Sequence, residues 1–207
     1  MRIKICGLFR EEDVEYINEA GVDYAGFVFA ESRRRVSGGL AERLRGRLGA
    51  GVVPVGVFVD AAPEEIAALY RGGVIDMAQL HGAEDGGYIA RLKEKSAEGG
   101  GLEPIPVIKT VMGADMGRAN ASAEGADYCL VDSGAGSGRA FDWGLIEPGA
   151  FSMPWFLAGG ITVGNVGRAA GLNPFAVDVS SGAETDGVKD RDKILRLATA
   201  ARKGKNL

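Results

Sequence analysis

Short apolar runs alternate with longer amphipathic runs along almost the whole chain. The apolar runs predict eight buried strands, at Arg2–Cys6, Tyr24–Phe29, Val53–Val59, Met77–Leu80, Ile105–Lys109, Tyr128–Asp132, Trp155–Ala158 and Phe175–Ser180. The amphipathic runs predict helices at Glu11–Ala20, Gly39–Leu48, Pro63–Tyr70, Asp85–Ala97, Asp115–Glu124, Val163–Ala170 and Asp192–Arg202, with a short segment near Trp143–Glu147. Because a parallel return needs a crossover of about a dozen or more residues, the alternation predicts parallel strands joined by helices.

This order of elements predicts a small (β/α)8 barrel that spans residues 1–207 as one domain. An open, doubly wound sheet is the alternative, because it uses the same strand and helix alternation. The chain has 207 residues, of which 46% are hydrophobic and 25% charged. That composition is enough for one large hydrophobic core.

The charge balance narrows the classes of partner. A formal net charge of −4 argues against a nucleic acid or an anionic membrane as partner, since either favours a basic face. The chain has no long apolar span, and its first residues lack the apolar core of a signal peptide, so we expect a cytoplasmic protein. Cys6 and Cys129 lie far apart without metal-ligand spacing, which predicts free thiols and no metal site.

Alternation along the strands predicts which side chains face the barrel axis. In the first strand Ile3 and Ile5 suit the helix-facing side, so Lys4 and Cys6 point inward, with Cys6 at the rim before Gly7. Cys129 is expected to be core packing. The same alternation predicts that Lys109 and Asp178 face the axis, where either one can be part of a buried ion pair.

Two glycine-rich turns follow the last two predicted strands, at Leu157-Ala158-Gly159-Gly160 and Asp178-Val179-Ser180-Ser181-Gly182. Paired turns at the carboxyl ends of the last two strands of a (β/α)8 barrel commonly hold phosphate through backbone N–H groups and a helix N-terminus. We therefore expect a small phosphorylated substrate, held by Gly159, Gly160, Ser180, Ser181 and Gly182. A third motif, Gly134-Ala135-Gly136-Ser137-Gly138, has the wrong spacing for a dinucleotide fingerprint and suits a loop over the substrate.

The strand ends resemble those of the phosphoribosylanthranilate isomerase family of tryptophan biosynthesis. The resemblance is carried, in the family's order, by Lys4-Ile5-Cys6-Gly7, Gly26-Phe27-Val28-Phe29, Ser32-Arg33-Arg34-Arg35-Val36-Ser37, Val55-Gly56-Val57-Phe58-Val59, Gln79-Leu80-His81-Gly82, Leu130-Val131-Asp132, Gly136–Trp143 and the two glycine turns. It implies a (β/α)8 barrel that needs no metal and no organic cofactor. It also implies the Amadori rearrangement of N-(5-phosphoribosyl)anthranilate to a 1-deoxyribulose 5-phosphate derivative.

The resemblance implies that Asp132 is the general acid, which protonates the ring oxygen, and that Cys6 is the general base, which removes the C2′ proton. Asp132 must then keep its proton near neutral pH, so its pKa must lie above the usual value of about 3.9. The Cys6 thiol needs the opposite shift, and we expect Lys4 to lower its pKa.

The resemblance also assigns residues to the substrate. Arg34 matches the arginine that pairs with the anthranilate carboxylate, with Arg35 as the fallback because the turn before it departs from the family pattern. On an extended segment Arg34 is expected to point away from Arg33 and Arg35. Position in the sequence suggests two further roles: His81, at the end of the fourth strand, is expected to line the anthranilate side of the pocket in a supporting role, and Asp178, two residues before the phosphate turn, to contact the sugar hydroxyls.

Two other functions fit parts of the pattern. The histidine-pathway isomerase performs the same type of rearrangement on a related barrel, but it typically has an aspartate where this chain has Cys6. A non-catalytic barrel that only binds a phosphorylated ligand needs neither Cys6 nor Asp132, and both are present. The sequence leaves open whether the protein is a monomer or a homodimer.

Overall fold

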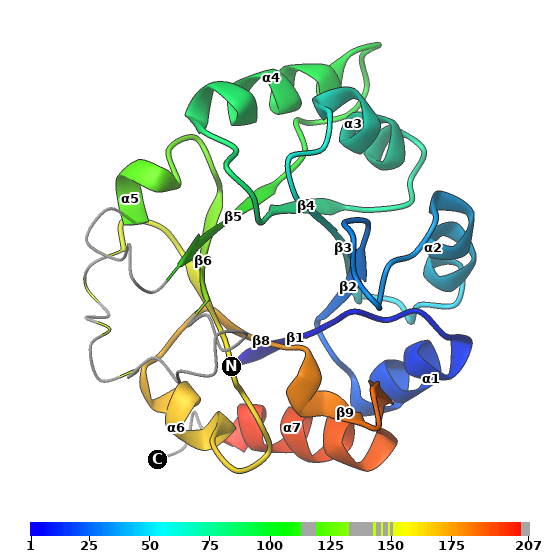
Figure 1. Ribbon diagram of the computed structural model, residues 1–207, viewed down its shortest axis with the longest axis vertical. Helices are drawn as coiled ribbons and strands as arrows, with labels where there is room; N and C mark the ends of the chain where they lie inside the picture. Colours follow the sequence, from blue (N-terminus) through cyan, green and yellow to red (C-terminus); the bar gives the residue numbers. More distant parts are fainter. Residues whose placement is uncertain (113–118, 133–142, 144–145, 147–148, 150, 204–207) are drawn as a thin grey trace.

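The computed structural model describes all residues of the chain except 113–118, 133–142, 144–145, 147–148, 150 and 204–207. Eight strands form a closed parallel barrel in sequence order: β1 Arg2–Cys6, β2 Tyr24–Val28, β3 Val53–Phe58, β4 Met77–Leu80, β5 Val107–Met112, β6 Tyr128–Asp132, β7 Trp155–Ala158 and β8 Ala176–Val179 (Figure 1). The barrel closes because β1 pairs with β8, for example Lys4 with Asp178. The predicted (β/α)8 barrel is therefore confirmed, and the open sheet is excluded.

Helices surround the barrel on the outside (Figure 1). They are α1 Glu11–Ala20, α2 Gly38–Arg45, α3 Pro63–Arg71, α4 Gly86–Ala97, α5 Ala119–Ser122, α6 Val166–Gly171 and α7 Arg191–Lys203. Side chains supply some of the caps, since Ser37 accepts a hydrogen bond from the Leu40 amide and Asp85 accepts one from the Tyr88 amide. The glycine-rich segment Gly134–Gly138 and parts of the predicted elements at Asp115–Glu124 and Trp143–Glu147 lie outside the described residues.

The fifth strand begins later than its apolar run. It starts at Val107 rather than Ile105, because Pro106 has no N–H group to donate to a neighbouring strand. The strand then continues to Met112. The last strand is followed by a short 3-10 helix, Ser181–Ala183, and by a hairpin of two short strands, β9 Glu184–Thr185 and β10 Val188–Lys189.

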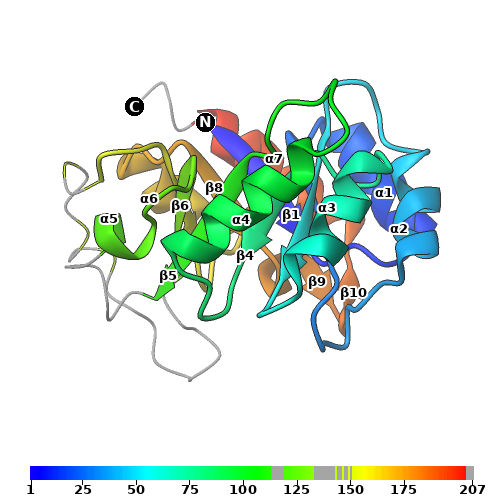
Figure 2. The same ribbon diagram turned by 90° about the horizontal axis from the view of Figure 1, so that it is seen from above.

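The barrel interior has two layers of different character. Toward the amino ends of the strands it holds a cluster of apolar and aromatic side chains: Tyr24, Val55, Met77, Ile108, Leu130, Phe156 and Ala176, with Tyr128 and Phe175 packed against them. The second layer, toward the carboxyl ends, is polar. The β9–β10 hairpin lies at the carboxyl-end face, opposite the face that holds the N-terminus (Figure 2).

Candidate active site

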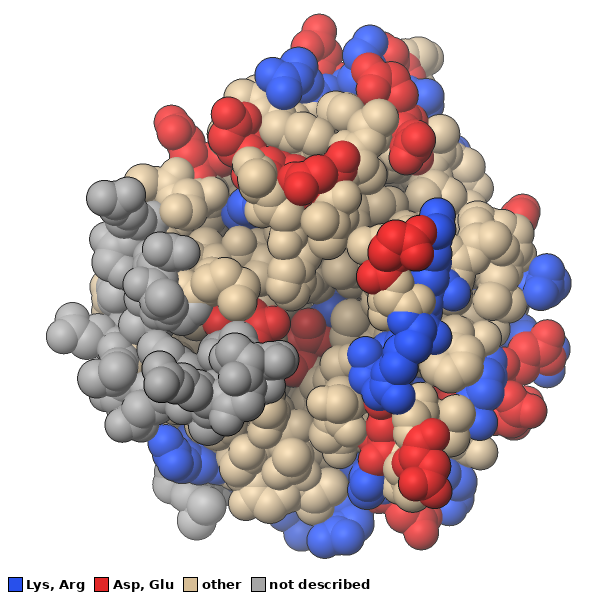
Figure 3. Space-filling model, in the orientation of Figure 1, with Lys and Arg blue, Asp and Glu red and all other residues tan. Residues whose placement is uncertain are grey.

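One cavity of about 510 Å³ opens at the carboxyl ends of the strands. Its lining includes all ten residues predicted for the site: Cys6, Arg34, His81, Asp132, Gly159, Gly160, Asp178, Ser180, Ser181 and Gly182. A hollow is visible near the middle of the barrel face, with acidic atoms in it and a group of basic side chains beside it (Figure 3). The structure therefore brings together residues that are spread over almost the whole sequence.

Cys6 ends β1 and is only 9% exposed. Its side chain fits because residue 26 on the neighbouring strand is glycine, where a Cβ atom would lie 2.9 Å from Sγ. Burial raises the pKa of the Cys6 thiol, and the lowering influence of the nearby Lys4 and Lys189 does not reverse it. Lys4 does lower this pKa, as expected, but burial outweighs it, so the net shift of the thiol is upward.

Lys4 lies one layer below Cys6 and points to the axis, as predicted. Its Nζ atom donates hydrogen bonds to Gln79 Oε1 at 2.8 Å and to Asp178 Oδ2 at 2.9 Å. Asp178 partly neutralises this ammonium group, which explains why Lys4 does not outweigh the burial of the thiol. The other carboxylate oxygen, Asp178 Oδ1, is buried and has no hydrogen-bond partner among the described residues. Asp178 thus belongs both to a buried ion pair and to the cavity wall.

Asp132 and His81 lie across the cavity from β1. Asp132 ends β6, which is separated from β1 by β7 and β8 in the closed barrel. The Nε2 atom of His81, which follows β4, is 3.8 Å from Asp132 Oδ2, within ion-pair range if the imidazole is protonated. Both side chains are partly exposed to the cavity.

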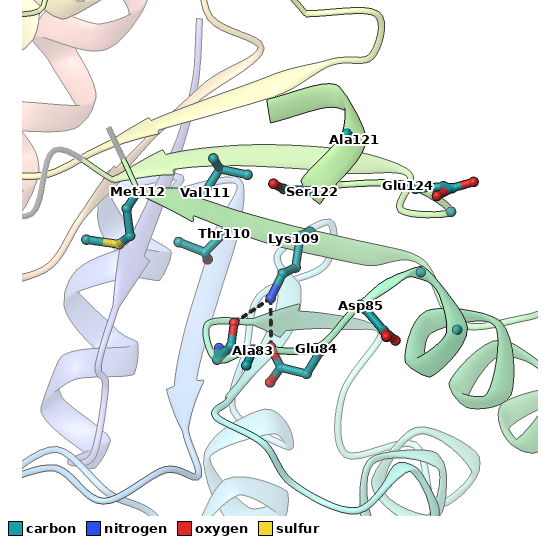
Figure 4. Close-up of a pocket in the computed structure, with 14 residues that line it drawn as sticks. Ala83, Glu84, Asp85, Lys109, Thr110, Val111, Met112, Ala121, Ser122 and Glu124 are labelled. Carbon is teal, nitrogen blue, oxygen red and sulfur yellow. Dashed lines mark hydrogen bonds and ion pairs between the residues drawn. The ribbon is translucent and has the colours of Figure 1, made fainter. Parts of the chain in front are cut away.

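Lys109 does not face the axis, so that part of the prediction is wrong. Its strand neighbour Ile108 takes the inward position in the apolar layer, and Lys109 turns toward the helices. There its Nζ atom donates to the Gly82 carbonyl at 2.7 Å and to Glu84 Oε2 at 2.8 Å, in a pocket at the start of α4 (Figure 4). This buried ion pair is separate from the cavity that holds Cys6.

The two glycine turns lie against each other at one side of the cavity. Gly159 and Gly160 have φ values of +86° and +66°, a region that favours glycine. A Cβ atom on Gly182 would lie 1.8 Å from the Ile161 carbonyl oxygen, so only glycine allows this contact. Asn165 fixes the first turn, because its amide nitrogen donates to Gly160 O at 2.9 Å and its oxygen accepts from the Thr162 amide.

The turns leave amide donors for a ligand. Within the described residues, the N–H groups of Gly160, Ser181 and Gly182 have no backbone acceptor. Backbone donors arranged in this way can bind an anion such as a phosphate group.

The three consecutive arginines follow a turn instead of an extended segment. The Arg34 amide donates to Ser32 Oγ at 3.1 Å, and the Arg35 amide donates to the Ser32 carbonyl at 3.0 Å. Arg33 and Arg34 consequently reach the same carboxylate, that of Glu184. The predicted divergence of Arg33 and Arg34 is therefore wrong.

Arg34 lines the cavity, whereas Arg35 pairs with Glu31 and lies outside the cavity lining. The stem of Arg34 crosses Gly7, where a Cβ atom would lie 2.3 Å from Arg34 Cδ. Gly7 has a φ of +83° and directly follows Cys6, so the local backbone brings the guanidinium group next to the thiol.

Sequence reasoning missed Glu184 and Lys189, which lie on the hairpin after β8. Burial raises the pKa of Glu184, but hydrogen bonds from Arg34 and Lys189 outweigh it and lower the pKa to about 2. The turn of this hairpin is Asp186-Gly187, and both residues have positive φ. An Asp-Gly pair flanked by residues of alternating polarity is a known hairpin signal, and it could have located these residues.

Fold and site together define a class: a (β/α)8-barrel protein with a cysteine, an aspartate and a pair of glycine turns around one cavity. Within the described residues, no helix combines the length and the apolar character that a membrane crossing requires.

Comparisons with known proteins identify the family. The family model described as "N-(5'phosphoribosyl)anthranilate (PRA) isomerase" matches residues 3–200. A similar protein, N-(5'-phosphoribosyl)anthranilate isomerase from Endomicrobium trichonymphae, is 44% identical over 207 residues, which cover 97% of this chain and 98% of the relative. The chain therefore belongs to the N-(5′-phosphoribosyl)anthranilate isomerase family, and the isomerase predicted from the strand-end motifs is confirmed.

Two solved structures of phosphoribosylanthranilate isomerases are similar to this chain. A phosphoribosylanthranilate isomerase in complex with reduced 1-(o-carboxyphenylamino)-1-deoxyribulose 5-phosphate is 37% identical, with a TM-score of 0.80 and 98% of each chain covered. Monomers generated from the dimeric isomerase of Thermotoga maritima are 36% identical, with a TM-score of 0.78 and both chains fully covered.

Proposed function

We propose that Cys6 and Asp132 are the general base and general acid of the isomerisation of N-(5′-phosphoribosyl)anthranilate, the reaction of this family in tryptophan biosynthesis. The observation that carries the proposal is the convergence of all ten predicted residues on one cavity, with Cys6 on β1 and Asp132 on β6. Asp132 protonates the ring oxygen, so that the furanose opens. Cys6 then removes the proton from C2′ of the ring-opened iminium ion to give an enolamine. The enolamine tautomerises to the ketose derivative by gaining a proton at C1′ and losing the proton of the 2′-hydroxyl.

The positions of the two groups suit these roles. A general acid and a general base that act on one sugar need to approach it from different sides. Cys6 and Asp132 end strands that are separated by two others in the closed barrel, and both face the same cavity. Lys4 and Lys189 favour the thiolate form of Cys6, while burial opposes it.

The remaining residues hold the substrate. The phosphate binds to backbone N–H groups of the turns at Gly159-Gly160 and Ser181-Gly182. Asp178 Oδ1, which is buried without a hydrogen-bond partner among the described residues, accepts a hydrogen bond from a sugar hydroxyl. Arg34 pairs with the anthranilate carboxylate. His81 lines the same cavity, and we assign it to the anthranilate side.

We further propose that the enzyme works in the cytoplasm, without a metal or an organic cofactor, as one (β/α)8 domain. A monomer or a homodimer is consistent with the proposal, and size-exclusion chromatography with light scattering distinguishes them.

The direct test is a coupled fluorescence assay with freshly made phosphoribosylanthranilate. We expect the purified protein to convert it without added metal, and inorganic sulfate or phosphate to compete with the substrate. Activity that a chelator abolishes and a divalent ion restores would contradict the metal-free mechanism. A crystal grown in sulfate that holds an anion elsewhere, with the glycine turns empty, would contradict the phosphate site.

A further inference from the structure

The β9–β10 hairpin carries a carboxylate that three basic side chains share. Glu184 is 4% exposed and accepts hydrogen bonds from Arg34 Nε at 2.6 Å, from Arg34 Nη2 at 2.8 Å and from Lys189 Nζ at 2.8 Å. Arg33 also donates to it, but the Arg33 side chain is largely exposed. Only Arg34 among these four residues lines the cavity next to Cys6.

The hydrogen bonds occupy one particular edge of the Arg34 guanidinium group. A guanidinium offers a side edge, formed by Nε and one Nη, and an end edge, formed by the two Nη atoms, and each can bind a carboxylate with two hydrogen bonds. Glu184 takes the side edge, with one oxygen on Nε and the other on Nη2. Nη1 of Arg34 has no hydrogen-bond partner among the described residues, so the end edge can bind a second carboxylate.

The orientation of Arg34 is fixed at both ends of its side chain. The stem lies against Gly7, which has no Cβ atom to obstruct it, and the head is held by Glu184. Glu184 is itself held, because buried Lys189 donates both to Glu184 Oε1 and to the Ser180 carbonyl at 3.1 Å. The Lys189 carbonyl also accepts a hydrogen bond from Arg10, which ties the hairpin to the start of α1.

The charges of this cluster do not balance. Arg34 and Lys189 are both mostly buried, and Glu184 is the one buried carboxylate that pairs with them among the described residues. The remaining positive charge lies beside the cavity. Such a surplus favours an anionic group on the bound molecule, and a planar carboxylate matches the end edge of a guanidinium better than it matches a lysine.

We propose that Glu184 is a positioning residue that turns the end edge of Arg34 toward the carboxylate of the substrate. Lys189 holds Glu184 in the required position. The inference rests on the proposed role of Arg34, and it adds that the hairpin determines how well the protein selects a substrate with a carboxylate. Glu184 acts through Arg34 and does not touch the reacting atoms.

The test is a double-mutant cycle in the phosphoribosylanthranilate assay. Glu184→Gln keeps the shape of the side chain but loses one acceptor and the charge, so Arg34 loses its fixed orientation. We expect KM to rise about tenfold with a much smaller change in kcat, the size of effect typical for the loss of a charge-assisted hydrogen bond. In an Arg34→Lys background, which itself raises KM, the same change should add less than about threefold.

Glu84→Gln is the matched control. Glu84 is equally buried and pairs with Lys109 at 2.8 Å, but it lies outside the cavity that holds Cys6. It should leave KM unchanged even if it lowers the melting temperature. A second readout uses two competitive inhibitors, a phenylamino-deoxyribulose phosphate with the carboxylate and one without it. Glu184→Gln should weaken binding of the first inhibitor only.

The outcomes separate the two proposals. If Arg34→Lys raises KM and Glu184→Gln does not, Arg34 binds the carboxylate and the positioning role of Glu184 is wrong. An equal rise of KM from Glu184→Gln in both backgrounds, or equal weakening of both inhibitors, would show a general structural effect and overturn the inference. If Arg34→Lys leaves KM unchanged, the proposed role of Arg34 fails first. Should Glu184→Gln not fold, Glu184→Asp retains the charge but is too short to hold both nitrogens, and KM must rise in the same way.

Discussion

The two layers of the barrel interior are built from the same strands but differ in almost every property. At the amino ends, Phe156 packs edge to face against Tyr24 and Tyr128, with ring centroids 5.5 and 5.7 Å apart. One layer further, fully buried Lys4 and the inward-facing Asp178 form an ion pair at 2.9 Å. The first layer is a cluster of apolar side chains, which we call the apolar plug. The second is a layer of charged side chains beneath the cavity.

The difference shows which layer stabilises the fold and which layer serves function. Apolar burial stabilises a fold without directional requirements, whereas a buried ion pair contributes little or nothing relative to well-packed apolar residues. A buried charge network at the carboxyl ends is therefore better explained by chemistry than by stability. This agrees with the general division of (β/α)8 barrels into a face for stability and a face for catalysis.

The largest expected effect is on turnover, and it concerns Cys6 and Asp132, which lie at the strand ends above the charged layer. Cys6→Ser and Asp132→Asn should each lower kcat by about 10²- to 10⁴-fold with little change in KM, because general acids and bases act in the transition state. Steady-state kinetics with phosphoribosylanthranilate measures this.

Cys129→Ser is the matched control for the cysteine. Cys129 is even more deeply buried than Cys6, but it faces the helix-side core. Its replacement should leave kcat within about threefold of the wild-type value, since it removes no group from the cavity. If Cys6→Ser turned over at the wild-type rate, Cys6 would not be the base.

The apolar plug should show the opposite behaviour. Phe156→Ala removes a fully buried ring and should lower the free energy of unfolding by about 3–5 kcal/mol, because it leaves a cavity among rigid neighbours. Among molecules that remain folded, kcat should change little. Urea unfolding and kinetics on the same preparation test both statements, and a loss of kcat like that of Cys6→Ser would erase the distinction between the layers.

The sequence predicted the barrel well because buried parallel strands are short, nearly continuous apolar runs. The bounds of β1, β4, β6, β7 and α1 coincide with those predicted. The prediction that Lys109 points to the barrel axis failed because both faces of a barrel strand are buried. Val107 and Ile108 are both apolar, so hydrophobicity gives no sign of which one points inward.

The site residues could be listed from motifs, but their interactions could not. The ion pair of Arg34 with Glu184 joins residues 150 positions apart, and no local pattern encodes it. Two-residue strands such as β9 and β10 are also too short to give a periodic signal. For Arg33 and Arg34 the error had a local cause, because Ser32 forms a turn where alternation assumes an extended chain.

A smaller effect is expected where the two glycine turns touch. Gly182→Ala would bring a Cβ atom to 1.8 Å from the Ile161 carbonyl oxygen, so the turns must separate. KM and the inhibition constant for inorganic phosphate should rise together by about tenfold, since the donors of both turns bind one anion.

Gly167→Ala tests whether this effect is specific. Gly167 lies in α6, and an added Cβ atom there meets nothing within 4 Å. The helix should tolerate or favour alanine, so KM should not change. A rise of KM without weaker phosphate inhibition in Gly182→Ala would move the phosphate site away from these turns.

The smallest expected effect is a change of melting temperature that depends on pH near Glu184 but not in the apolar plug. The pKa of Glu184 is about 2 in the folded protein, whereas an ordinary glutamate in an unfolded chain has a pKa of about 4.3. Because the folded value is lower, the stabilising contribution of Glu184 is complete above about pH 5 and is lost as the pH falls toward 2. The melting temperature of Glu184→Gln should therefore lie a few degrees below that of the wild type at pH 7, and the difference should shrink between pH 5 and 3.

Phe156→Leu, in the apolar plug, should show a difference that is the same at each pH, because no titratable group is changed. A Glu184→Gln difference that does not vary with pH would mean that this carboxylate does not stabilise the fold through its charge.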